Sequence, residues 1–133
     1  MKKILKLVIM VLAISAILCG CDHEMPMQKS VDKIVKIELL NEKAGGTICI
    51  MTDEDVVWFT EDLLSLECHK NLHPLGECGY LQIYMYYEDG NADVIGCMSN
   101  AQIIDGERIQ NGWYYFDEAE LLALFGRYTE PKS

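Results

Sequence analysis

From residue 31 onward, apolar and polar residues alternate with the two-residue period of β-strands. Segments 31–40 and 47–51 follow this pattern, and Gly45-Gly46 between them predicts a turn. The period places four apolar residues of the first segment on one face: Val31, Val35, Ile37 and Leu39. We therefore expect two neighbouring strands at the start of the folded part of the chain.

Beyond residue 51 the apolar period lengthens to that of an amphipathic helix. Thr52 and Asp55 have the spacing of a capping box, so we expect the helix to begin at Thr52. Four apolar residues then form one stripe: Val56, Phe59, Leu63 and Leu66. The pattern fades near Cys68, and Pro74 and Gly76 predict a loop.

The second half of the chain returns to the strand period and ends in another helix. Strands are expected at 80–88 and 92–98, with a hairpin turn at 89–91, and further short antiparallel strands within 103–116. Asp117 begins a capping box for a last helix, which we expect to stop at Gly126. The order β-β-α-β-β-β-β-α predicts an α+β domain, a single antiparallel sheet with two helices packed on one face.

The first residues have a different character. A head with three lysines precedes an apolar run over residues 7–18, which is shorter than the roughly 20 residues needed to cross a bilayer. Leu18-Cys19-Gly20-Cys21 then resembles the lipobox of bacterial lipoproteins, whose last cysteine carries lipid. The resemblance implies a cleaved signal peptide over residues 1–20 and lipidation of Cys21. An uncleaved anchor is the alternative, and both interpretations place the rest of the chain outside the cytoplasm.

The lipobox divides the chain into four parts. Residues 21–30 show no periodicity and are expected to be a tether, residues 31–128 a single α+β domain, and residues 129–133 a tail. This domain resembles the small lipoproteins of Gram-positive bacteria. The resemblance implies a cell membrane location, lipid-anchored on the extracytoplasmic face of the cell envelope.

The charge balance restricts the partners. The chain has 11 Lys and Arg against 21 Asp and Glu, a net charge of −10, and loss of the three signal-peptide lysines takes it to −13. Such a charge repels nucleic acid and anionic lipid headgroups. The expected partners are the membrane through the lipid anchor, and an envelope protein or a small ligand; no nucleic acid and no cofactor are expected.

Four cysteines remain beyond the lipobox, and several interpretations stay open for them. Cys68 with Cys78 and Cys49 with Cys97 are candidate disulfides, because exported domains permit such bonds; unpaired thiols are the alternative. A weaker hypothesis is a metal site made of the zinc-competent side chains Cys68, His69, His73 and Cys78.

A row of aromatic residues is the other candidate site. Tyr80, Tyr84 and Tyr86 share one face of the third strand, where Trp113 can join them, and tyrosine is favoured in binding surfaces. Alternatively, these tyrosines only cover an open sheet face, because tyrosine has high β-propensity.

The sequence contains no motif of a known catalytic class, so we expect no enzyme. The first hypothesis is a lipid-anchored, non-catalytic binding module. The alternative is a metal-binding or thiol-redox envelope protein that uses the segment 68–78.

Overall fold

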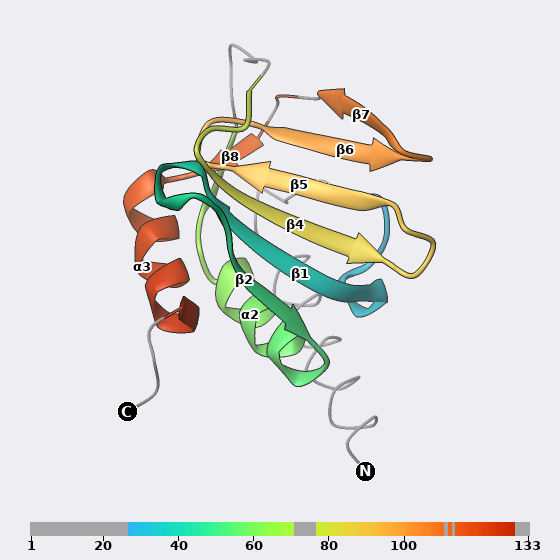
Figure 1. Ribbon diagram of the computed structural model, residues 1–133, viewed down its shortest axis with the longest axis horizontal. Helices are drawn as coiled ribbons and strands as arrows, with labels where there is room; N and C mark the ends of the chain where they lie inside the picture. The colour runs from blue at the N-terminus through green and yellow to red at the C-terminus, as the bar shows by residue number, and fades with distance from the viewer. Residues whose placement is uncertain (1–26, 71–76, 111, 113, 130–133) are drawn as a thin grey trace.

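The computed structural model describes residues 27–70, 77–110, 112 and 114–129. Its main layer is a six-stranded antiparallel sheet with the strand order β2-β1-β4-β5-β6-β7. The strands are β1 (Ile34–Asn41), β2 (Gly46–Thr52), β4 (Leu81–Tyr87), β5 (Ala92–Gly96), β6 (Asn100–Ile104) and β7 (Glu107–Gln110). In Figure 1 the sheet is seen face-on, with helix α2 (Glu54–Leu64) behind β2 and helix α3 (Glu118–Thr129) beside the far end of β1. The predicted α+β class and the antiparallel sheet are confirmed.

The core lies between the sheet and the two helices. Residues of alternating position in β1 and β4 face it, among them Ile37 and Leu39 from β1 and Ile83 and Met85 from β4. The helices contribute buried side chains to the same cluster: Val56, Val57, Phe59, Leu63, Leu121, Leu124 and Phe125. Both helices therefore pack on one face, as expected, and the opposite sheet face has no helix over it in the described part of the chain.

Val35 was expected on the same strand face as Ile37 and Leu39, and this prediction is wrong. The segment begins as a 3₁₀ turn, η1 (Val31–Lys33), and the pairing of β1 with β4 shifts register between Ile34 and Lys36. An irregularity of this kind breaks the two-residue alternation of side chains. Ile34 is therefore buried and Val35 is 48% exposed.

The expected start of the first helix is also wrong. Thr52 remains in β2, where it pairs with Lys36, and the helix α2 begins at Glu54. Asp53 stands between them with a positive φ of 53°, and its side chain makes no capping bond. Pairing of the strand therefore overrides the local capping pattern.

The last helix begins where the sequence predicts. The Asp117 carboxylate accepts hydrogen bonds from the backbone N–H groups of Ala119 and Glu120, at 3.1 and 3.3 Å. The predicted stop at Gly126 is wrong, because α3 continues to Thr129. Tyr128 explains the extra turn, since its ring packs edge-on against Phe59 and its hydroxyl donates to Asp62 over 2.5 Å.

A second, two-stranded sheet was not expected. It pairs β3 (Cys68–Lys70), from a segment predicted to be a loop, with β8 (Tyr114–Phe116), which we expected in the main sheet. Cys68 and Phe116 are directly opposite each other and both are buried in the core. Three-residue strands are too short to show a period, so the sequence pattern could not predict this pairing.

Candidate functional site

Strand register determines which side chains share the uncovered face of the main sheet. Residues directly opposite each other in antiparallel strands point to the same side. One row runs across the sheet from Lys36 through Tyr86, Ala92 and Ile103 to Arg108. A second row runs from Ile50 through Glu38, Tyr84 and Val94 to Ala101. We call the side chains of these two rows the open face.

Two tyrosines and two cations dominate the open face. The rings of Tyr84 and Tyr86 are stacked, with their centroids 6.1 Å apart. The Lys36 ammonium lies 4.3 Å from the Tyr86 ring centroid, and the Arg108 guanidinium carbon lies 6.0 Å from that of Tyr84. Cation–ring contacts of this kind are attractive because the ring face carries partial negative charge. Glu38 lies 3.6 Å from Lys36 and partly balances its charge.

Arg108 extends far across the sheet from its edge strand. Neighbouring strands lie about 4.8 Å apart, so β7 and β4, three spacings away, lie about 14 Å apart. The guanidinium nevertheless donates to the Tyr84 hydroxyl over 2.8 Å, so the two long side chains meet above β5 and β6. Small residues lie beneath them: Val94 and Ala101 are buried although no helix of the described residues covers them.

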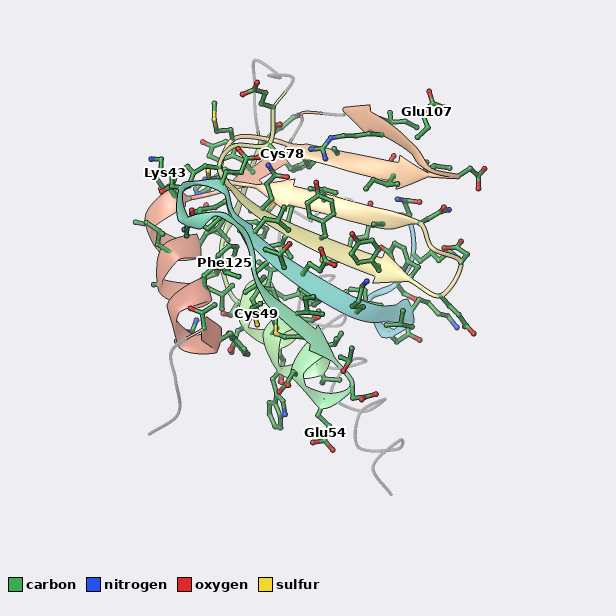
Figure 2. The ribbon with its side chains drawn as sticks, in the orientation of Figure 1. Lys43, Cys49, Glu54, Cys78, Glu107 and Phe125 are labelled. Carbon is green, nitrogen blue, oxygen red and sulfur yellow. The ribbon has the colours of Figure 1, made fainter. Side chains whose placement is uncertain are left out.

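Cys78 supplies the third component of this cluster. It packs with Val94 and Ala101, and the Arg108 guanidinium donates to its sulfur over 3.4 Å. Burial raises the pKa of the Cys78 thiol, while the nearby Arg108 charge lowers it. Figure 2 shows Cys78 and Lys43 toward one end of the sheet and Glu107 toward the other.

The structure brings together only part of the predicted aromatic row. Tyr84 and Tyr86 lie side by side, whereas Tyr80 has separate partners, the Lys43 ammonium 3.9 Å from its ring and the Glu118 carboxylate. The hydrogen bond to Glu118 raises the pKa of Tyr80 to about 12. Trp113 lies outside the described residues.

The candidate disulfide cysteines lie in different surroundings. Cys68 belongs to the main core and Cys78 to the small cluster of the open face. Cys97 and Cys49 pack from the rim of the main core, with Cys49 near the Tyr128 carbonyl. The structure contains no disulfide bond between any two of these four described cysteines. The two pairings remain predictions.

The candidate metal ligands are not assembled in the described residues. No three His, Cys, Asp or Glu side chains come together there in an arrangement that could hold a metal ion. His69 stacks on Tyr115 with a centroid distance of 5.3 Å, and His73 lies outside the described residues.

Comparison with known proteins adds no further constraint. Neither a protein-family model nor a curated protein nor a solved structure matches the chain. Within residues 27–129, as far as the structure describes them, no helix has the length and apolar character to cross a membrane.

A second polar cluster lies at the end of the sheet, under the hairpin between β4 and β5. Asp93 is 3% exposed and accepts hydrogen bonds from the Tyr87 hydroxyl, from the Gln28 backbone N–H at 2.8 Å and from the Gln28 amide group at 3.3 Å. The Gln28 amide group also donates to the Ala92 carbonyl over 2.6 Å. The last residues of the predicted tether are therefore bonded to the sheet.

Sequence reasoning missed Arg108, Cys78 and Asp93 as members of these clusters. The turns at 89–91 and 105–106 pair β4 with β5 and β6 with β7, which relates Tyr86 to Ala92 and Ile103 to Arg108. The turn between β5 and β6 at residues 97–99 was not predicted, because the sequence pattern assigned Cys97 and Met98 to the strand 92–98. A register assigned to that turn would have placed Arg108 beside the tyrosines.

Proposed function

We propose that the chain is a membrane-anchored extracytoplasmic lipoprotein whose domain binds a partner, without catalysis, through the open face. The observation that carries the binding role is the stacked pair Tyr84 and Tyr86 with Lys36 and Arg108 beside it. The anchor rests on the lipobox that ends at Cys21.

Composition and exposure support the use of this face. Tyrosine and arginine are enriched in the parts of interfaces that contribute most to binding. Tyr84 and Tyr86 are only half-buried, and Ile50 at the edge of the same face is 60% exposed. A partner could therefore cover aromatic and aliphatic surface that now faces solvent.

The lipid anchor is tested on protein isolated from the membrane fraction of the cells that produce it. Mass spectrometry of the N-terminal peptide is expected to find a chain that begins at Cys21 and carries lipid. The variant Cys21→Ala is expected to remain unprocessed, because it lacks the thiol that receives the lipid. A mature chain that begins elsewhere, or an intact N-terminus in the wild type, would contradict the anchor.

The binding role is tested by in-cell photo-cross-linking at two matched positions. A photoreactive residue replaces Ile50 on the open face, or Leu122, which is 44% exposed on helix α3. Discrete adducts are expected from position 50 and not from position 122, and they should disappear in the double variant Tyr84→Ala, Tyr86→Ala. Equal adducts from both positions, or adducts that survive the double variant, would refute the proposed face.

A further inference from the structure

The central position of the Arg108 guanidinium suggests what the open face binds. The side chain starts on the edge strand β7, yet its head is held over the middle of the sheet by Tyr84 and Cys78. These contacts occupy two of the five N–H groups that an arginine carries. The remaining N–H groups can donate hydrogen bonds to a ligand. The position of the guanidinium is already fixed before the ligand binds.

Arg108 has no carboxylate beside it in the described part of the chain, a feature that it shares with Lys33, Lys43 and Lys70, but its head group differs from theirs in being held by two hydrogen bonds. Lys29, Lys36 and Arg127 each have a carboxylate within 4 Å, from Asp89, Glu38 and Asp62 respectively. Among the described residues no carboxylate lies that close to Arg108, although the chain has 21 Asp and Glu residues. Its contacts there are a phenol and a sulfur atom. A fixed guanidinium without a carboxylate beside it is complementary to an oxyanion, which can accept two parallel hydrogen bonds from its N–H groups.

We infer that Arg108 binds a carboxylate of a peptide segment from the partner protein, a segment in which one acidic residue or a C-terminal carboxylate stands among apolar side chains. This inference rests on the proposed function and names the ligand of the same face. The apolar neighbours of that carboxylate would lie against Tyr84, Tyr86 and Ile103, which share the open face with the guanidinium.

The net charge selects a carboxylate over more highly charged anions. A chain with a net charge of −10 repels any approaching anion, and the repulsion grows with the charge of the ligand. A carboxylate carries one negative charge, whereas a phosphate monoester carries about 1.5 to 2 at neutral pH. One carboxylate within an apolar segment therefore gains the contact with Arg108 at the smallest repulsive cost.

The inference is tested by selection from a displayed library of random peptides against the full chain in detergent. The enriched peptides are expected to share one Asp, one Glu or a free C-terminal carboxylate within an apolar sequence. The variant Arg108→Gln is expected to bind them about tenfold to a hundredfold more weakly, because a hydrogen bond between charged groups is lost. Arg127→Gln removes a positive charge from helix α3 and is expected to bind like the wild type. Circular dichroism establishes that each variant is folded, and Arg108→Lys keeps the charge if Arg108→Gln does not fold.

Peptides in which Gln replaces the acidic residue complete the test. They are expected to bind the wild type as weakly as the acidic peptides bind Arg108→Gln. The affinity of the Gln-containing peptides for Arg108→Gln should be only slightly lower still, because the same contact is already lost. The inference fails if the library yields no binder, if the binders share no carboxylate, or if Arg108→Gln binds them like the wild type. Should their affinity then still depend on Tyr84 and Tyr86, the proposed binding face stands and only its carboxylate specificity falls.

Discussion

At the scale of single residues, the Asp93 carboxylate is a buried polar group with three hydrogen-bond donors. It is buried at the end of the sheet and accepts from Tyr87 and from two N–H groups of Gln28. A buried carboxylate is tolerated only when hydrogen bonds replace its hydration, and here a residue of the expected tether supplies them. Asp93 therefore joins the N-terminal segment to the domain.

Replacement of Asp93 by Ala is expected to lower the free energy of unfolding by about 3 kcal/mol, because Tyr87 and Gln28 lose a buried acceptor. Urea unfolding measures this loss. Gln28→Ala and Asp93→Ala both remove the bond between the Gln28 amide group and Asp93, so the loss in the double variant is expected to be smaller than the sum of the two single losses. Glu88→Ala, in the same hairpin but exposed, serves as the control and should change stability little. Fully additive losses would contradict the shared network.

Two tyrosines, Tyr87 in the core and the partly buried Tyr128, make the fold sensitive to alkali. Burial raises the pKa of Tyr87, and its hydrogen bond to Asp93 raises it further; burial and a bond to Asp62 raise the pKa of Tyr128 in the same way. The folded state thus holds these protons more tightly than the unfolded chain, whose tyrosines titrate near pH 10. Stability is expected to be fully present below about pH 10 and to fall as the pH rises above it. Urea midpoints across this range test the loss, which Tyr87→Phe should reduce.

At the scale of elements, the sequence predicted those features that depend on neighbours along the chain. The strand expected at 80–88, the hairpin after it and the Asp117 cap are set by local patterns and are present, whereas the strand expected at 92–98 ends earlier, at Gly96. The errors arise where a distant partner decides. Thr52 stays in β2 because it pairs with Lys36, and α3 passes Gly126 because Tyr128 packs on Phe59. The Arg108 cluster belongs to the same class, since it needs three strand pairings at once.

Mutagenesis can show which of the two predicted helix caps, Asp117 or Thr52, stabilises its helix. Asp117→Ala is expected to lower the free energy of unfolding by about 1 kcal/mol, because two backbone N–H groups at the start of α3 lose their acceptor. Thr52→Ala removes no cap from α2 and should cost less than about 0.5 kcal/mol. Equal losses, measured by urea unfolding, would mean that Thr52 has a capping role after all.

Glycine offers a second test of the last helix. Gly126 lies inside α3, and a Cβ placed on it would meet no atom within 4 Å. Gly126→Ala is therefore expected to stabilise the protein by about 0.5–1 kcal/mol. A Cβ on Gly96 would lie 2.1 Å from the Cys78 carbonyl oxygen, so Gly96→Ala is expected to be strongly destabilising. Opposite shifts in melting temperature are the expected result, and a lower value for Gly126→Ala would argue that the helix ends earlier.

At the scale of the whole molecule, the contact between Gln28 and Asp93 restricts how an anchored domain stands on a membrane. With lipid on Cys21, as proposed, seven residue steps lead to Gln28, which span at most about 25 Å. Gln28 is bonded beside the hairpin between β4 and β5, while the turn between β1 and β2 lies at the opposite end of these strands. Strands of seven residues are about 23 Å long, so the two ends should differ in height above the bilayer.

This orientation predicts unequal energy transfer to the membrane surface. A fluorophore introduced as an unnatural residue at Glu88, in the hairpin, is expected to transfer energy to acceptor-labelled lipid headgroups more efficiently than one at Ala44, in the far turn. Both positions are exposed, so neither label should disturb the core. Asp93→Ala removes two of the three hydrogen bonds that hold Gln28, and it is expected to bring the two efficiencies closer together because the segment then holds the domain less firmly. Equal efficiencies in the wild type would show that the bonded segment does not orient the domain. A stronger signal from Ala44 would place the opposite end of the sheet nearer to the bilayer.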